Sequence, residues 1–389
     1  MKVSFWLDWK SRLFLDSIKA IKDSFSSDDL TDGQGMFSSI DFGEDFTFNV
    51  QRRGAGNHPF VLKCGDITLM FSNHKVDAQH PNCRLEIGSV SCWVPGAFDL
   101  VDRVMHWLVE RGASISQQKI MESHLTVDLL HVDFSQTGLF DINRWICRAT
   151  KSKLCFENFE PNYFSSGKGK VMMRAYDKTG ELKPGSSKEI AFQDLWSAHL
   201  GGLPPEHVTR IEFQLRRDYF KESNINTVYQ LQEDLNAIWE YCTGEWSRFT
   251  SRPLEIKDRK NKNHQRFKTA FLWEYIRSVR FNAAPVQKLE RGLPVNHVNV
   301  DHLVRQASGC ILTVCAAVGH SFDDVAEHAV TATQLISKYL YNEHSTNNKE
   351  YKRKMKVKRN QAYVCFDSAY EGWSPQSYHE RRGSHVTST

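Results

Sequence analysis

The chain has 389 residues, of which 40% are hydrophobic and 25% are charged, with a formal net charge of +4. This composition excludes a disordered protein, and the length allows two or three domains with substantial cores. No apolar run is long enough to span a membrane, and charges interrupt the first stretch, MKVSFWLDWKSRLF, too often for a signal peptide. The nine cysteines include no Cys-x-x-Cys pair, which argues against a zinc ribbon. We therefore predict a cytoplasmic protein with no membrane partner.

The charges are divided unevenly along the chain. Residues 1–245 contain 27 Lys and Arg against 33 Asp and Glu, a balance of −6, whereas residues 246–389 contain 23 against 13, a balance of +10. Two basic runs stand out in the second part, KDRKNKNHQRFK at 257–268 and KEYKRKMKVKR at 349–359. One such run is as often a solvated surface as a polyanion site, but two of them in one half favour nucleic acid.

The first half has the pattern of a sheet with helices. Residues 26–39 have the composition of a loop, so residues 1–45 are predicted to form a separate N-terminal element and linker. Strand patterns follow at 82–93, 124–134, 169–178 and 208–217, and residues 97–112 have the apolar spacing of a helix. We predict an α+β fold, a mostly antiparallel sheet with flanking helices, within a domain at 46–225.

After residue 225 the pattern becomes helical. Apolar residues recur at helical spacing over 228–242, and residues 301–341 also have a helical pattern. We predict a basic helical region at 226–345. The last residues mix Ser, Gly, Pro and charge, so 346–389 are predicted to be a basic, loosely ordered tail.

Strand alternation gathers polar side chains on one face of the predicted sheet. In the strand at 171–178, Arg174, Tyr176 and Lys178 share a face, and Tyr176 is expected to point outward between two cations. The strand at 208–217 separates its residues cleanly, and its polar face consists of Arg210, Glu212, Gln214 and Arg216. Each feature alone is more often an amphipathic surface or a surface ion pair. Their occurrence on neighbouring strands favours a functional site.

Two aspartates belong to the strand pattern at 124–134. Asp128 and Asp133 lie on opposite faces if the alternation is unbroken, and a one-residue bulge near Leu129 would place both on one face. Together with Glu212 on a neighbouring strand, these carboxylates are suited to bind a hard cation.

The order of these motifs resembles the replication initiation factor family, the rolling-circle initiators of plasmids and filamentous-type phages, which are related to some mobile-element relaxases. The resemblance rests on RLEIG, a helix, HLTVDLLHVDF, YFSSGKGKVMMRAYDKTGEL and VTRIEFQLRR, over about residues 80–220. The chain departs from the family pattern in two places, since its aspartates are five apart instead of four and Ser165 replaces a glycine. It contains no His-hydrophobic-His pair, which marks the other large class of rolling-circle initiators.

The resemblance implies a metal-dependent enzyme that nicks and rejoins DNA. Tyr176 would attack a phosphorus of single-stranded origin DNA, leaving a 5′-phosphotyrosyl link and a free 3′-OH, with Arg174 and Lys178 beside it. Tyr163 would be structural, substrate-contacting or a second nucleophile. The implied Mg²⁺ or Mn²⁺ site consists of Glu212 with Asp128 or Asp133, and His131 is a substitute ligand.

The predicted DNA contacts come from both halves of the chain: Arg210, Arg216, Lys168, Lys170, Lys260, Lys262 and Arg266. The predicted partners are single-stranded and double-stranded origin DNA, a host helicase and polymerase, and a second copy of the chain in a homodimer. Two alternatives remain open: a noncatalytic DNA-binding or copy-control protein, and a conjugative relaxase with the same chemistry.

Overall fold

The computed structural model describes the chain in segments. These are residues 1–10, 12–24, 39–41, 46–72, 80–255, 267–283, 286, 289, 297–299, 307–314, 325–346, 348, 351–352 and 363–365. The chain divides into two compact units, residues 1–291 and 292–389. The candidate site lies in the first unit.

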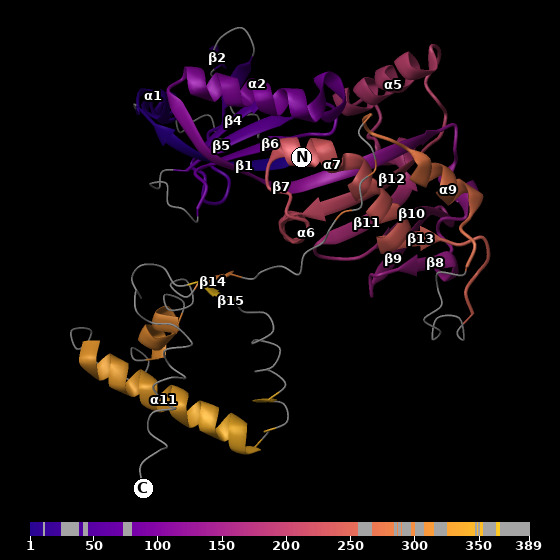
Figure 1. Cartoon of the computed structure of the whole chain (residues 1–389). Coiled ribbons are helices and arrows are strands. Elements are labelled where there is room, and N and C mark those ends of the chain that lie inside the picture. Colours follow the sequence, from indigo (N-terminus) through magenta and orange to yellow (C-terminus); the bar gives the residue numbers. More distant parts are fainter. Residues whose placement is uncertain are drawn as a thin grey trace. The chain divides into compact units, whose positions relative to one another are not determined.

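An antiparallel sheet is the framework of the first unit (Figure 1). Among the described residues it has eleven strands, in the order β2-β3-β4-β5-β6-β1-β7-β12-β11-β10-β9. The first strands are β1 (Lys2–Trp9), β2 (Ser39–Asp41), β3 (Thr47–Val50), β4 (Phe60–Cys64), β5 (Ile67–Phe71) and β6 (Cys83–Ile87). The others are β7 (Ala113–Leu130), β9 (Ser152–Glu157), β10 (Glu160–Ser166), β11 (Val171–Asp177) and β12 (Val208–Arg216). This sheet and its flanking helices confirm the predicted α+β fold.

The long strand β7 joins the two halves of the sheet. Its first part, from Ala113 to Glu122, pairs with β1, and its second part, from Glu122 to Leu130, pairs with β12 on the other edge. In Figure 1 the indigo and purple strands therefore form one half, and the magenta and pink strands form the other. Only the second half contains the strands on which the site was predicted.

The N-terminal strand β1 lies inside the sheet. It pairs with β6 on one edge and with β7 on the other, and the side chains of Val3, Phe5 and Leu7 are fully buried. The prediction of a separate element at residues 1–45 was wrong. The loop composition after β1 suggested a boundary, but pairing between distant segments placed the strand at the centre.

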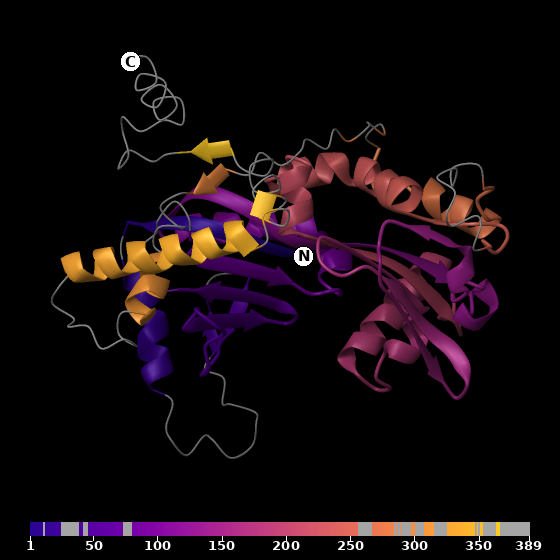
Figure 2. The ribbon, with the colours of Figure 1, turned by 90° about the horizontal axis from the view of Figure 1, so that it is seen from below.

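Helices cover the two faces of the second half. On one face, Trp239 of α7 (Val228–Glu240) contacts Phe213 of β12, with ring centroids 5.5 Å apart. On the other face, the indole of Trp196 in α5 (Ser187–Leu200) donates a hydrogen bond to β7. Figure 2 shows α5 and α7 on opposite sides of the sheet. The predicted boundary at residue 225 is therefore not a structural division, because α7 completes the core of the sheet.

The remaining described elements are helices and short strands, of which α1, α2 and α9 also bury side chains in the core. The first unit also contains α1 (Leu13–Asp23), η2 (Cys92–Gly96), α2 (Ala97–Glu110), α3 (Phe134–Thr137), η3 (Ile142–Arg144), β8 (Trp145–Cys147), α4 (Lys178–Glu181), α6 (Arg217–Glu222), η4 (Tyr241–Trp246), β13 (Ser247–Phe249) and α9 (Phe271–Ser278). The helix predicted at 97–112 is α2, and Gly112 follows it with a φ of 84°, as expected of a helix stop.

The second unit is described only in parts. They are a helix at 307–314, α11 (Val325–Thr346), and a parallel pair of β14 (His297–Asn299) with β15 (Tyr363–Cys365). Helices are therefore present within the range predicted to be helical. In the described segments of the chain, none of the helices combines the length and the apolar character needed to cross a bilayer.

A capping box at the start of α7 gives a prediction for the stability of this layer. The Thr227 hydroxyl accepts a hydrogen bond from the Gln230 backbone N–H, and the Gln230 side chain accepts one from the Thr227 N–H. We expect Thr227→Ala to lower the free energy of unfolding by about 1 kcal/mol, because a helix N–H loses its acceptor. Urea unfolding measures this loss. Thr227→Ser should retain most of the stability, and equal losses in both variants would contradict the capping role.

Candidate functional site

The predicted polar face exists, but the structure buries it. Antiparallel register places Arg174 opposite Glu212 and Tyr176 opposite Arg210. Arg210 is 3% exposed, Glu212 5% and Tyr176 8%. The prediction that Tyr176 points outward was wrong, since α5 and the loops around it cover a face that alternation alone assigns to solvent.

Glu212 is the centre of the site. Its Oε2 accepts a hydrogen bond from the Tyr176 hydroxyl at 3.0 Å, and its Oε1 lies 3.0 Å from Arg174 Nη1 and 2.7 Å from His124 Nδ1. Burial raises the pKa of the Glu212 carboxyl, but the hydrogen bond and charge of His124, the charge of Arg174 and the Tyr176 hydrogen bond outweigh it and lower that pKa to about 2. Glu212 is therefore an ionised carboxylate at neutral pH.

The pKa values of Tyr176 and Lys178 are shifted in opposite directions, and burial is the main cause of both shifts. Burial, followed by the charge of Glu212, raises the pKa of the Tyr176 hydroxyl well above its usual value. Burial, followed by the charge of Arg210, lowers the pKa of Lys178 to about 8, although Lys178 forms an ion pair with Glu181. Lys178 does not continue the strand as predicted, because it begins α4, and its ammonium lies 6.0 Å from the centre of the Tyr176 ring.

Asp128 is fully engaged by a second buried pair. The Arg210 guanidinium binds both of its carboxylate oxygens, at 2.6 and 2.7 Å, and the Trp196 indole N–H donates to it at 3.0 Å. The same guanidinium also lies over Phe192 of α5, with its carbon 4.9 Å from the ring centre. Asp128 and Arg210 therefore hold α5 on the sheet.

The predicted bulge near Leu129 was also wrong. The register of β7 against β12 is continuous from Glu122 to Leu130, and β7 ends before Asp133. Asp133 is instead the N-cap of α3, where its side chain accepts from the Ser135 N–H at 2.8 Å. His131 lies between them with a left-handed backbone, φ 58°.

These positions do not fit the predicted metal site. The oxygens of Glu212 and Asp128 already accept hydrogen bonds from arginine, tyrosine, tryptophan or histidine, and Asp133 caps a helix. In the described part of the chain, no group of three or more His, Cys, Asp and Glu side chains is arranged to hold a metal ion. A requirement for Mg²⁺ or Mn²⁺ stays a prediction from the sequence.

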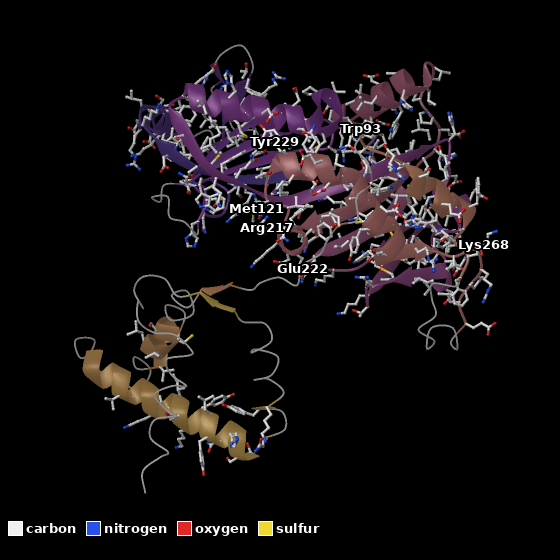
Figure 3. The ribbon with its side chains drawn as sticks, in the orientation of Figure 1. Trp93, Met121, Arg217, Glu222, Tyr229 and Lys268 are labelled. Atoms are coloured by element: carbon white, nitrogen blue, oxygen red, sulfur yellow. The ribbon has the colours of Figure 1, made fainter. Side chains whose placement is uncertain are left out.

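Two cavities open beside Glu212 and its hydrogen-bond partners. One is a cavity of about 690 Å³ beside β7, lined by Glu212, Arg210 and His124 and by Trp93, which is labelled in Figure 3. The other is a pocket of about 320 Å³ on the Tyr176 side. Its lining consists of Glu157, Asn162, Tyr163, Arg174, Tyr176, Asp177, Gly180 and Glu181. Tyr163 pairs directly with Tyr176 across β10 and β11, with ring centroids 6.1 Å apart.

The predicted DNA-contact residues are separated in space. Arg210 belongs to the buried pair, and Arg216 is exposed at the end of β12, 3.7 Å from Glu122. Lys168 and Lys170 lie in the turn between β10 and β11, where Lys170 forms an ion pair with Glu222. Glu222 is labelled in Figure 3.

The basic runs fall almost entirely outside the described residues. This applies to Lys260, Lys262 and Arg266, and to nearly all of 349–359. At the end of the first run, Lys268 is described and its side chain is exposed (Figure 3).

Sequence reasoning missed two members of the site. His124 shares its face with Asp128 by the same alternation that placed Arg210 with Glu212, so its position could have been predicted. Trp196 could not, because its contact depends on where α5 packs. Comparisons with known proteins add nothing to this assignment, since no protein-family model matches the chain and no curated protein is significantly similar to it.

The depressed pKa of Glu212 predicts a pH dependence of stability. A carboxyl that titrates near 2 in the folded protein and near 4.5 in the unfolded chain stabilises the fold above about pH 4.5, and this contribution is lost as the pH falls towards 2. We expect Glu212→Gln to lose less stability than wild type between pH 5 and pH 3, measured by urea unfolding. The pKa of Glu122 is also lowered to about 2, so Glu122 contributes the same pH-dependent loss of stability in both proteins. If the free energy of unfolding falls equally with pH in both proteins, the lowered pKa of Glu212 is contradicted.

Proposed function

We propose that this protein is a rolling-circle replication initiator that nicks and rejoins single-stranded origin DNA through Tyr176. The observation that carries this proposal is the hydrogen bond from the Tyr176 hydroxyl to Glu212, at 3.0 Å. A hydroxyl that donates to an ionised carboxylate, itself fixed by Arg174 and His124, has the arrangement of a nucleophile with an oriented base.

In the proposed step, a bond forms between the Tyr176 oxygen and the scissile phosphorus while the bond from phosphorus to the 3′-oxygen breaks. The tyrosine proton passes to Glu212 as the new bond forms, since the raised pKa of Tyr176 keeps the hydroxyl protonated beforehand. The departing 3′-oxygen takes a proton from water. Lys178 is 1% exposed and does not line the Tyr176 pocket, so it acts only as a nearby cation, 6.0 Å from the centre of the Tyr176 ring. Rejoining is the reverse reaction, so the phosphodiester energy is retained.

Arg174 is the cation placed to meet the phosphate. Its side chain is partly exposed in the pocket that also contains Tyr176, and its two terminal nitrogens bind Glu212 and Gln214. A guanidinium held in this way stabilises the charge that develops on the phosphate oxygens. We propose origin DNA, a host polymerase and helicase, and a second copy of the chain as the partners of this reaction.

A second candidate function is a noncatalytic DNA-binding or copy-control protein. Two observations favour it: Tyr176 is almost completely buried, and Glu157, Asp177 and Glu181 line its pocket and repel phosphate. A relaxase remains a third candidate, which differs from the first only in the DNA that it cuts.

A covalent-capture experiment separates these functions. The full-length protein is incubated with labelled single-stranded DNA from the intergenic region of its own element, with Mg²⁺, with Mn²⁺ or with excess chelator, and the products are separated on a denaturing gel. We expect a labelled protein band that migrates faster after nuclease digestion and disappears after protease digestion. If no substrate and no ion give this band, the nicking function is refuted and the noncatalytic function is favoured.

A further inference from the structure

A third pocket lies at the opposite end of β11 from Tyr176. It has a volume of about 480 Å³ and is formed by the turn between β10 and β11, the segment after β8, and η4. All of its charged lining residues are cations: Arg148, Lys151, Lys168 and Lys170. We refer to it as the turn pocket. None of the residues assigned to the proposed reaction lines it.

The turn pocket is held by main-chain contacts. The Gly167 N–H donates to the Lys151 carbonyl and the Arg148 N–H to the Trp246 carbonyl, each at 2.9 Å. Gly167 has a φ of 94°, and a Cβ there would lie 2.6 Å from the Val171 carbonyl oxygen and 2.9 Å from the Trp246 ring. Only glycine fits this close approach. The fold therefore fixes the backbone that carries the lysines.

Two of the four cations are not neutralised. Arg148 pairs with Glu245 and Lys170 with Glu222, but neither carboxylate lines the pocket. Among the described residues, Lys151 and Lys168 have no acidic partner, and both are exposed. Two free ammonium groups in a pocket without carboxylates attract an anion, and a lysine binds phosphate as a point charge.

We propose that the turn pocket binds the phosphodiester backbone of single-stranded DNA. The free lysines come from two segments, so they suit successive phosphates of a chain better than one small anion. The rings of Tyr241 and Trp246 are buried in the wall, at 6% and 7% exposure, and offer no open face for a base to stack on. The pocket therefore contacts phosphates and does not read sequence.

The turn pocket would anchor the single-stranded DNA that Tyr176 cuts, so this inference rests on the proposed function. Lys170 precedes Tyr176 by six residues, and a strand rises about 3.3 Å per residue, so the turn pocket lies roughly 20 Å along the strand from the nucleophile. The pocket wall includes η4, whose Trp246 packs on Phe213, whereas Tyr176 lies on the opposite, α5 side of the sheet. The bound strand therefore has to pass around the edge of the sheet, and several nucleotides cover this path, since an OB fold contacts about 4–16 nucleotides of single strand.

Salt-dependent binding tests the turn pocket separately from catalysis. The affinity of the full-length protein for a fluorescein-labelled, 20-nucleotide single strand of mixed sequence is measured by anisotropy at several NaCl concentrations. We expect K151E/K168E to bind at least about tenfold more weakly, and the slope of log K against log salt to decrease in size by about 1.4, at about 0.7 per lost phosphate contact. K151Q/K168Q should show the same slope change, with an unchanged melting temperature.

The matched control is K19E/K63E, which makes the same change of net charge at two exposed lysines on α1 and β4. Equal weakening in both charge-reversal variants, or an unchanged slope in K151E/K168E, would overturn the proposal. Inorganic phosphate or ATP that displaces the DNA at micromolar concentration would make the turn pocket a small-anion site and also overturn it. Covalent capture with the same protein preparations measures the reaction at Tyr176 alone. If the wild-type protein binds DNA through the turn pocket but forms no adduct, only the proposed enzymatic function is refuted.

Discussion

Tyr176→Phe is expected to eliminate the covalent protein–DNA adduct and to reduce nicking by roughly 10³-fold or more, because the attacking oxygen is absent. The ring remains, so packing against Tyr163 is retained. The variant loses one hydrogen bond to Glu212, a cost of about 1.5–3 kcal/mol, while Arg174 and His124 still hold that carboxylate. Covalent capture and denaturing electrophoresis measure the adduct, and urea unfolding measures the stability.

Tyr163→Phe is the matched control, because this ring lines the same pocket and pairs with Tyr176 across the strands. It should form the adduct at close to the wild-type level. If Tyr176→Phe still forms an adduct and Tyr163→Phe does not, the nucleophile is Tyr163. A double variant that is still captured would refute both tyrosines.

Asp128→Asn is expected to have the largest effect on stability, about 3–5 kcal/mol. Arg210 is 3% exposed and binds both oxygens of Asp128, so neutralising the carboxylate leaves a guanidinium buried without its counter-charge. The new amide also turns an N–H towards a group that only donates. Chemical unfolding at neutral pH measures the loss, which is a large fraction of the 5–15 kcal/mol that stabilises a typical domain.

Two further variants test the cause of this loss. Adding Arg210→Leu to Asp128→Asn removes the unpaired charge and should recover part of the stability, because replacing both partners is less costly than removing one. Arg84→Ala breaks the pair with Glu86, in which both side chains are about one-third exposed, and should cost no more than about 1 kcal/mol. A similar loss at Arg84 and at Asp128 would mean that burial is not the reason.

Much of the second half of the sheet could be predicted from local pattern. The alternation in VTRIEFQLRR placed Arg210, Glu212 and Gln214 on one face, and the register of β11 and β12 brings Arg174 to Glu212 on that face. Helical spacing also located α2 and α7. These features depend on neighbours in sequence, and so the sequence contains their signal.

Pairing between distant segments could not be predicted in this way. β1 was assigned to a separate element, although it lies between β6 and β7 some eighty to one hundred and twenty residues later. The bulge proposed to bring Asp133 beside Asp128 does not occur, because β7 pairs regularly with β12 and ends at Leu130. Neither outcome has a local signature, since strand order is set by which edges meet in the folded core.

The sequence by itself determined the α+β class, the strands of the site and the polar face shared by Arg174, Tyr176 and Glu212, because a strand alternates its side chains with a period of two whatever surrounds it. Tertiary structure alone decided how that face is used. The packing of α5 through Trp196 and Phe192 covers this polar face. Side chains that alternation places in solvent are therefore buried and form ion pairs with one another. Charge in a low-dielectric site is costly unless it is paired, so the environment, which alternation does not encode, set the pKa values of Glu212, Tyr176 and Lys178.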